Sequence, residues 1–189
     1  MELFRSTGAY LQGHFLLTSG LHSGAYLQCA LVLQHPDAAE KLGRSLAGQL
    51  RRLAGPDVRT VASPALGGLI IGHEVARALG ARFIFTERDA ATKKMALRRG
   101  FTVTPGETVV VVEDIITTGG STHDVAEVLR TAGANVLAAG SIIDRSGGQA
   151  SVGVPRAALV TLEVDTYDPA ACPLCKAGTP AVKPGSRPA

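Results

Sequence analysis

The chain has 189 residues and is 46% hydrophobic and 19% charged, a composition typical of one soluble globular domain. Its net charge of +3 suits a small anionic substrate but is too small to indicate nucleic-acid binding, and its apolar runs fall short of the roughly 18 residues that a membrane span needs. The amino terminus lacks a signal pattern and the three cysteines are an odd number, so we expect a cytoplasmic protein without a disulfide framework.

The amino-terminal part of the chain mixes short elements with one long helix. We expect a short helix over residues 2–12, followed by two strands over Gly13–Ser19 and Ala25–Leu33. Pro36 then opens a long helix with apolar residues at helical spacing, and Gly55 ends it.

The middle of the chain alternates strands with helices, which predicts the α/β class with a mostly parallel sheet covered on both faces. The expected strands are 58–62, 82–86, 109–112, 135–143 and 157–164. Helices are expected over 70–79 and from Ser121 onward, and the Pro- and Gly-rich tail from Asp165 is expected to be irregular. In such sheets, ligands bind at the carboxyl ends of the strands.

The most informative stretch is residues 109–122. A run of four valines predicts a buried strand, and it ends in two carboxylates, Glu113 and Asp114. A loop of Thr and Gly follows, and Ser121 with Asp124 forms a candidate capping pair for the next helix. Backbone amides at a helix start hold an anion, whereas the two carboxylates would repel it and so must serve another part of the ligand. A sugar with both a phosphate and free hydroxyls satisfies both conditions.

This stretch resembles the binding motif for phosphoribosyl diphosphate (PRPP) of the type I phosphoribosyltransferases: an apolar strand, two acidic residues, two apolar residues, then Thr-Thr-Gly-Gly-Ser. The alternative, an ordinary strand-to-helix turn, leaves the paired acids and threonines unexplained. The resemblance implies the type I phosphoribosyltransferase fold, with a central, mostly parallel sheet flanked by helices. Within a single domain it implies a small hood over about residues 1–35, a core over about 36–164 and a tail over about 165–189.

The resemblance also implies the PRPP contacts of this motif. They are Glu113, Asp114, Ile115, Ile116, Thr117, Thr118, Gly119, Gly120 and Ser121. The acidic pair would hold the ribose hydroxyls and favour a positively charged ribose in the transition state. Mg²⁺ would be bound mainly through PRPP itself rather than through protein side chains.

A second glycine loop, residues 63–68, follows the first core strand. Its exposed amides at Gly67 and Gly68 suit a second anion. The resemblance makes this the pyrophosphate loop, with Ala65 and Gly67 among the PRPP contacts; the alternative is a plain strand-to-helix turn.

Residues 87–100, here called the lid segment, are polar and basic without a clean period and are expected to form a mobile loop. In orotate phosphoribosyltransferases the equivalent loop closes over the diphosphate and reaches into the neighbouring subunit of a homodimer. This implies diphosphate contact and a catalytic role for Lys93 and Lys94, and a structural or PRPP contact for Arg88. Arg98 and Arg99 are read equally well as surface residues. The segment departs from the better-known version because it contains no His.

Two further features resemble the orotate enzymes. Asp144-Arg145 follows the strand over 135–143, and an Arg can bind a carboxylate with two hydrogen bonds. The resemblance makes Arg145 the contact for the orotate carboxylate; the alternative is a local ion pair between Asp144 and Arg145. Residues 13–20 resemble the hood over the base, which implies Phe15 as an orotate contact together with Thr117, although many members carry Lys in place of Thr18.

Together these resemblances imply an orotate phosphoribosyltransferase that makes orotidine 5′-monophosphate and pyrophosphate from PRPP and orotate, in the formation of UMP. The alternatives are a phosphoribosyltransferase of purine or uracil salvage, or a non-catalytic regulator that binds PRPP. The single pair Cys172 and Cys175 is a weak signal for zinc or redox chemistry, because Cys29 is distant and no His partner is evident. A metal shared across a dimer is the remaining reading of this pair.

Overall fold

The structure is a computed structural model that describes residues 2–17 and 19–184. The chain divides into two compact units. The first unit combines the two ends of the chain, residues 1–34 and 163–189, and the second comprises residues 35–162. Over the described residues, the helices are too short or too polar to span a bilayer.

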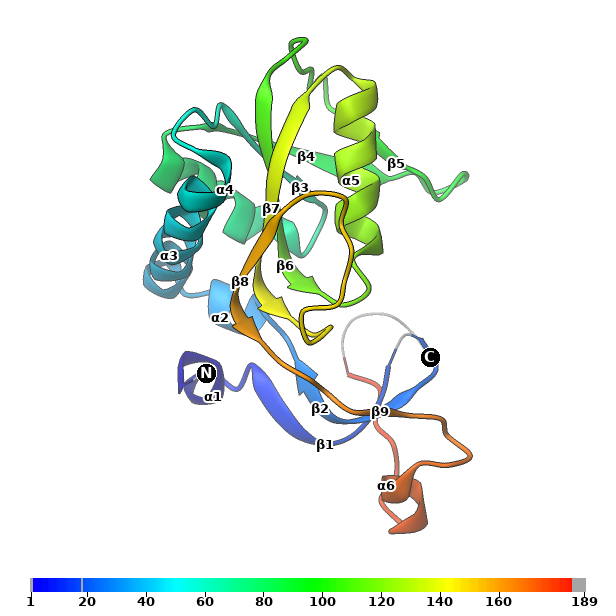
Figure 1. Cartoon of the computed structure of the whole chain (residues 1–189). Coiled ribbons are helices and arrows are strands. Elements are labelled where there is room, and N and C mark those ends of the chain that lie inside the picture. Colours follow the sequence, from blue (N-terminus) through cyan, green and yellow to red (C-terminus); the bar gives the residue numbers. More distant parts are fainter. Residues whose placement is uncertain (1, 18, 185–189) are drawn as a thin grey trace. The chain divides into compact units, whose positions relative to one another are not determined.

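The second unit is built on a six-stranded sheet with the order β5-β4-β3-β6-β7-β8 (Figure 1). Its strands are β3 (Thr60–Pro64), β4 (Arg82–Arg88), β5 (Met95–Leu97), β6 (Thr108–Ile116), β7 (Asn135–Asp144) and β8 (Arg156–Thr161). The neighbouring strands run parallel, apart from the antiparallel pair β4 and β5. The predicted α/β class with a mostly parallel sheet is therefore confirmed.

Helices cover both faces of this sheet (Figure 1). They are α3 (Pro36–Ala54) and α4 (Gly68–Leu79) on one side and α5 (Gly120–Thr131) on the other. Pro36 occupies the first turn of α3, and Gly55 ends it with a positive φ of 80°, as the sequence predicts.

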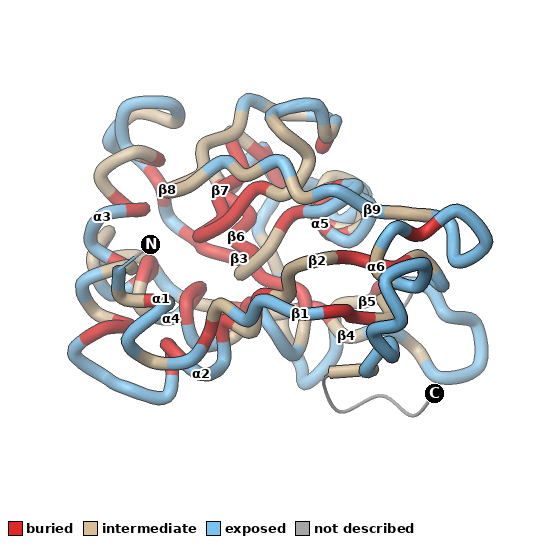
Figure 2. The backbone as a smooth tube through the Cα atoms, turned by 90° about the horizontal axis from the view of Figure 1, so that it is seen from below, coloured by how far each residue is buried: buried red, intermediate tan, exposed pale blue. Residues whose placement is uncertain are grey.

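The valine run of β6 lies at the centre of the core, and all four valines are fully buried. Because side chains alternate along a strand, Val109 and Val111 pack in the cluster that includes Val125 and Leu129 of α5, while the other two valines point to the opposite face. Buried residues concentrate in β3, β6 and β7 (Figure 2). This burial fixes the strand that carries the acidic pair.

The first unit contains a three-stranded antiparallel sheet with the order β1-β2-β9. Its elements are α1 (Glu2–Ser6), β1 (Tyr10–Leu16), β2 (His22–Leu27), α2 (Ala30–Leu33), β9 (Thr166–Tyr167) and α6 (Pro173–Lys176). Both ends of the chain contribute to it, because β2 pairs with β9 and Phe15 forms a bridge with Val182.

Several expected elements differ in extent. The helix expected over 2–12 ends at Ser6, because Gly8 with φ 69° breaks it and the following residues join β1. The strand expected over Ala25–Leu33 ends at Leu27, and its last four residues form α2. The tail expected to be irregular instead contains β9 and α6, since it pairs with the first hairpin.

The loop expected over residues 87–100 is largely a β-hairpin. β4 continues to Arg88 and pairs antiparallel with β5, in the register Thr86 with Leu97 and Arg88 with Met95. Met95 is buried and packs in the core beside α5, which explains why this strand forms. The turn between the two strands, residues 89–94, is what remains of the predicted loop.

Candidate functional site

Three loops meet at one edge of the parallel sheet. They follow β3, β6 and β7, which are adjacent and parallel, so their carboxyl ends lie together. The loops after β6 and β7 are joined directly, because the Arg145 N–H donates a 2.8 Å hydrogen bond to the Ile116 carbonyl. The sequence predicted a ligand site at this edge.

The loop after β6 encloses a cavity of about 110 Å³. The cavity is lined by Glu113, Ile115, Ile116, Thr117, Thr118, Gly119, Gly120, Ser121 and Thr122. It lies at the amino terminus of α5, where free backbone amides and the helix dipole favour an anion. Its residues are those that the sequence predicted for PRPP, with Thr122 in addition and Asp114 absent.

Glycine is required at the turn into α5. Gly119 has φ 84°, and a Cβ there would lie 2.9 Å from Val152 Cγ1 and 3.1 Å from the Ser151 carbonyl oxygen. The predicted capping pair of Ser121 and Asp124 is wrong: Gly119 is the N-cap and no side chain caps the helix. Asp124 instead pairs with Arg88 at 3.1 Å. The amide end of the helix is thereby left to the cavity.

The acidic pair lies beside this loop, with Glu113 buried and Asp114 half-buried. Burial, together with the neighbouring charge of Asp114, raises the pKa of Glu113 from 4.5 to about 8, although a hydrogen bond from the Thr122 hydroxyl opposes the shift. Burial also raises the pKa of Asp114, whose Oδ1 accepts a 2.8 Å hydrogen bond from the Ile115 amide. Two adjacent carboxyls whose pKa values are both raised are typical of a functional site.

The second glycine loop touches the acidic pair. A Cβ on Gly67 would lie 2.6 Å from Asp114 Oδ1, and one on Gly68 would lie 2.9 Å from Ser63 Cβ. Side chains at these positions would therefore collide with the site. The loop is anchored to β4, because the Ala65 amide donates a 2.8 Å hydrogen bond to the Thr86 carbonyl. Glu113 thus lines the cavity of the loop 117–121, while Asp114 faces Gly67 of the predicted pyrophosphate loop.

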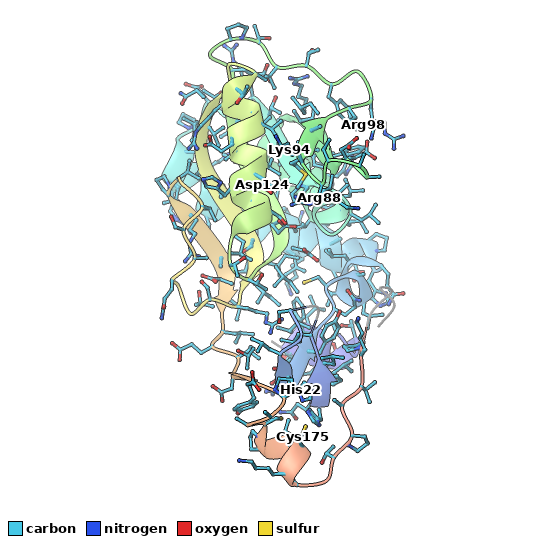
Figure 3. The ribbon with its side chains drawn as sticks, turned by 90° about the vertical axis from the view of Figure 1, so that its right-hand side faces the viewer. His22, Arg88, Lys94, Arg98, Asp124 and Cys175 are labelled. Carbon is cyan, nitrogen blue, oxygen red and sulfur yellow. The ribbon has the colours of Figure 1, made fainter. Side chains whose placement is uncertain are left out.

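Within the lid segment, the arginines have local partners. Arg88 donates from Nη1 to the Lys93 carbonyl at 2.7 Å and from Nη2 to Asp124 of α5 at 3.1 Å (Figure 3). Arg99 forms a bidentate ion pair with Glu87. Arg98 lies 3.9 Å from Asp89, whose carboxylate also accepts hydrogen bonds from the turn. These contacts stabilise the hairpin and its position against α5.

The two lysines differ from the arginines. Lys93 and Lys94 are exposed, and among the described residues neither forms an ion pair with a carboxylate. Lys93 has φ 59° at the end of the turn, a conformation that is uncommon outside glycine. The two ammonium groups on this turn are therefore exposed cations that no carboxylate of the described residues neutralises.

Asp144 and Arg145 diverge at the end of β7. Asp144 is buried and forms its ion pair with Arg156 of β8, while its Oδ1 accepts 2.8 Å and 2.6 Å hydrogen bonds from the Ser146 amide and hydroxyl. Burial opposes ionisation of Asp144, but Ser146 and Arg156 outweigh it and lower its pKa. The carboxylate of Asp144 thus pairs with Arg156, whereas the sequence offered Arg145 as its partner.

Phe15 belongs to the first unit. It is buried and lies 5.9 Å, ring centroid to centroid, from Tyr26 of the neighbouring strand. Thr18, where the sequence departs from many orotate enzymes, lies outside the described residues. The orotate contact expected of Phe15 stays a prediction.

Two associations were missed by reasoning from the sequence. The pair of Arg88 and Asp124 joins residues 36 positions apart, and no local pattern indicates it. The second is a cluster of His14, His22, Cys172 and Cys175, in which the two halves are separated by about 150 residues of sequence.

Comparison with known proteins agrees with this geometry. The family model described as "Phosphoribosyl transferase domain" matches residues 32–153. An orotate phosphoribosyltransferase of Pelotomaculum thermopropionicum is 56% identical over 187 residues, covering 99% of this chain and 96% of the relative. One from Thermotoga maritima is 52% identical over 186 residues, covering 98% of this chain and 97% of the relative.

Solved structures show the same likeness. The crystal structure of orotate phosphoribosyltransferase from Aeropyrum pernix superimposes with a TM-score of 0.67 at 27% sequence identity. The match covers 86% of this chain and 93% of that chain.

Proposed function

The chain belongs to the phosphoribosyl transferase family and, within it, to the orotate phosphoribosyltransferases, and from this premise we propose how its residues perform the transfer. The reaction moves ribose 5-phosphate from PRPP to orotate and gives orotidine 5′-monophosphate and pyrophosphate, a step in pyrimidine formation. The observation that carries the assignment of roles is the 110 Å³ cavity at the start of α5, with the acidic pair of Glu113 and Asp114 beside it.

The cavity residues Thr117 to Ser121 hold the 5-phosphate. Their amides surround the cavity at the positive end of α5, and the hydroxyls of Thr117, Thr118 and Ser121 add donors. Ile115 and Ile116 contribute backbone contacts. The cavity volume of about 110 Å³ suits one phosphate group better than a whole nucleotide.

Glu113 and Asp114 bind the ribose hydroxyls. With its pKa raised to about 8, Glu113 is largely protonated at neutral pH in the free protein, so it can donate a hydrogen bond as well as accept one. As positive charge develops on the ribose, ionised carboxylates become more favourable. The pair therefore stabilises the transition state more than the ground state.

Mg²⁺ is the proposed cofactor, and the donor set fits it. Hard oxygen ligands suit this ion, and Asp114 has both carboxylate oxygens beside Gly67 of the pyrophosphate loop. PRPP would supply most of the ligands. When bound, the ion neutralises charge on the diphosphate.

Bond making and breaking require no protein nucleophile. N1 of orotate gives up its proton to solvent or to the leaving pyrophosphate and forms a bond to C1 of the ribose, as the bond from C1 to the pyrophosphate oxygen breaks and pyrophosphate leaves with the electron pair. The protein positions the reactants and stabilises charge. Ala65 and Gly67 contact the diphosphate through the main chain, and Lys93 and Lys94 neutralise it from the lid segment while excluding water.

Arg145 binds the orotate carboxylate with two hydrogen bonds, and Thr117 and Phe15 complete the orotate site. Support for Arg145 comes from its position: its amide is bonded to Ile116, one residue before the phosphate loop begins. Uracil and the purine bases lack this carboxylate. We further propose a homodimer in which the lid segment serves the neighbouring subunit, and a cytoplasmic location.

One experiment tests this function. The purified chain is incubated with PRPP and Mg²⁺ and is offered orotate, uracil and purine bases in separate reactions, while base consumption is followed. Orotate alone should be consumed. Consumption of uracil or a purine would reassign the substrate, and binding of PRPP without consumption of any base would identify a regulator.

A further inference from the structure

Four metal-binding side chains converge in the first unit, away from the phosphate loop in sequence. His14 lies on β1, His22 begins β2, Cys172 precedes α6 and Cys175 lies within it. Their ligand atoms all lie within 4.8 Å of one another. Figure 3 shows Cys175 facing His22 across the gap between α6 and the hairpin.

The separations between the ligand atoms are close to those around a tetrahedral zinc ion. Zinc–nitrogen and zinc–sulfur bonds of about 2.0 and 2.3 Å place nitrogen and sulfur ligands about 3.5 Å apart. Cys172 Sγ and Cys175 Sγ lie 3.4 and 3.8 Å from His14 Nε2, and Cys175 Sγ lies 3.4 Å from His22 Nδ1. The two ring nitrogens are 2.7 Å apart, so a bound ion would move them apart to about 3.3 Å.

The outer contacts orient His14 for a metal. Its Nδ1 lies 2.6 Å from the Thr179 carbonyl oxygen, which accepts hydrogen bonds only, so Nδ1 carries the proton. Nε2 is then the unprotonated nitrogen, and it faces His22 and both sulfurs. A carbonyl that accepts from the far nitrogen of a metal-bound His is the usual second contact in zinc sites.

The surroundings also favour a closed structural site. His14 is 3% exposed, His22 is 8% exposed and Cys172 is fully buried, whereas Cys175 lies at the surface and offers a path of entry. Four protein ligands leave no open position for substrate or water. Two sulfurs and two nitrogens in tetrahedral array indicate zinc rather than magnesium or calcium, which prefer oxygen.

We propose that His14, His22, Cys172 and Cys175 bind one structural zinc ion that fastens the carboxyl-terminal segment to the amino-terminal hairpin. All four ligands come from one chain, in contrast to the metal shared across a dimer that the sequence left open. The first unit is small and its core contains few large apolar side chains, so an ion that crosslinks its two segments adds stability that burial alone supplies poorly.

The ion would act on the same segments that β2 and β9 join by strand pairing. The Val182 amide donates to the His14 carbonyl at 2.8 Å, and the Leu16 amide donates to the Val182 carbonyl at 2.9 Å. Ser23 Oγ donates to the Asp165 carbonyl at 3.0 Å. These hydrogen bonds align the amino-terminal hairpin with the carboxyl-terminal segment. The proposed metal ion would add a crosslink between the same two segments.

Metal content is measured on the full chain, purified under reducing conditions without an affinity tag that binds metal. Elemental analysis should find one zinc per chain, and Cys172→Ser and Cys175→Ser should each lower zinc content at least about tenfold. Two matched controls, Cys29→Ala and His73→Ala, change a cysteine and a histidine outside the cluster and should retain zinc. Zinc-free wild-type protein, or unchanged zinc in both serine variants, would overturn the proposal.

Cobalt substitution keeps the test decisive if the variants fold poorly. The wild-type chain, stripped with a chelator and titrated with Co²⁺, should develop the strong visible bands of a tetrahedral site and a thiolate-to-cobalt band at equivalence. Zinc added afterwards should abolish both. Absence of these bands in folded protein, or loss of both free thiols to a Cys172–Cys175 disulfide in the freshly purified chain, would contradict the site.

Discussion

Asp144 at the end of β7 forms an ion pair with Arg156 at the start of β8, and this pair fixes the turn that presents Arg145. Ser146 donates to the same carboxylate from both its amide and its hydroxyl. The Arg145 amide is bonded in turn to the Ile116 carbonyl. The backbone of Arg145, the proposed orotate contact, is therefore held by bonds that do not involve its side chain. Removing that side chain should leave the loop in place, so the variant tests the side chain alone.

Arg145→Ala should raise the KM for orotate by about ten- to a hundredfold, the cost of a lost charge-assisted, two-pronged hydrogen bond, and should change the KM for PRPP much less. Steady-state kinetics with each substrate varied in turn will show the split. Arg44→Ala is the control, since Arg44 is an exposed residue of α3 that pairs with Glu40. Equal effects on the two KM values would remove the carboxylate role.

The lid lysines should act on turnover rather than on ground-state binding. The double variant Lys93→Ala/Lys94→Ala should lower kcat by about tenfold or more, because charge on the leaving pyrophosphate is no longer neutralised. Affinity for orotidine 5′-monophosphate, measured by calorimetry, should change little, since the product lacks the diphosphate. Arg98→Ala, which removes an exposed cation 3.9 Å from Asp89, should keep near-normal kcat. A similar loss in both variants would indicate a general charge effect.

Asp114→Asn should lower kcat strongly while the fold stays intact, as judged by circular dichroism and the melting temperature. Asn keeps the shape and the acceptor for the Ile115 amide but removes the charge that favours a positive ribose. Near-normal turnover in this variant would remove the ribose role of the acidic pair.

Glu113 should make the free protein less stable at alkaline pH. Its folded pKa is raised from 4.5 to about 8, so its contribution is fully present below pH 4.5 and is lost as pH rises toward 8, where the buried carboxyl must ionise. Glu113→Gln stays neutral and should raise the melting temperature at pH 8 more than at pH 5, while turnover falls. Glu127→Gln, an exposed residue of α5, should shift neither. An equal shift at both pH values would contradict the raised pKa.

Sequence patterns predicted the local structure around the candidate site well, because its strand, loop and helix start are contiguous in the chain. The valine run, the acidic pair and the Thr-Gly loop follow one another directly in the chain. Their pattern therefore indicated a strand, the carboxyl end of that strand and the start of a helix. The strand, the loop and the helix lie where the sequence predicts them. The same reasoning failed for the cap of α5. Asp124 has the residue type and spacing of a capping partner, but its carboxylate instead forms an ion pair with Arg88 of β4, a strand distant in the sequence.

Contacts between distant segments account for the other differences. Residues 87–100 lack a clean period because β5 is three residues long and is held by one buried side chain, Met95, against α5. The tail looked irregular because its order depends on pairing with the first hairpin. His14 and His22 looked ordinary for the same reason: only the fold brings them to Cys172 and Cys175.

A cluster at the opposite edge of the sheet should govern acid stability. Glu107 accepts hydrogen bonds from the Thr104 amide at 2.8 Å, from the Thr60 hydroxyl and from Arg82 at 2.8 Å. Burial alone would raise the pKa of Glu107, but these three partners outweigh it and lower the pKa from 4.5 to about 2. The cluster joins the first residue of β3, Thr60, to the first residue of β4, Arg82, and to Glu107 just before β6, so it stabilises this edge of the sheet.

Because the folded pKa is depressed, the contribution of Glu107 is fully present above pH 4.5 and is lost as pH falls toward 2. Glu107→Gln should therefore lower the free energy of unfolding at pH 7 by about 1.5–3 kcal/mol, the usual range for hydrogen bonds to a charged group. The difference between variant and wild type should shrink when urea denaturation is measured at pH 3 instead of pH 7. At low pH the stabilisation that depends on ionised Glu107 is also lost from the wild type. Arg82→Ala should behave alike, since it removes the partner of the same carboxylate. A loss that stays constant with pH would mean that the glutamine disturbs packing, and that the charge of Glu107 contributes nothing.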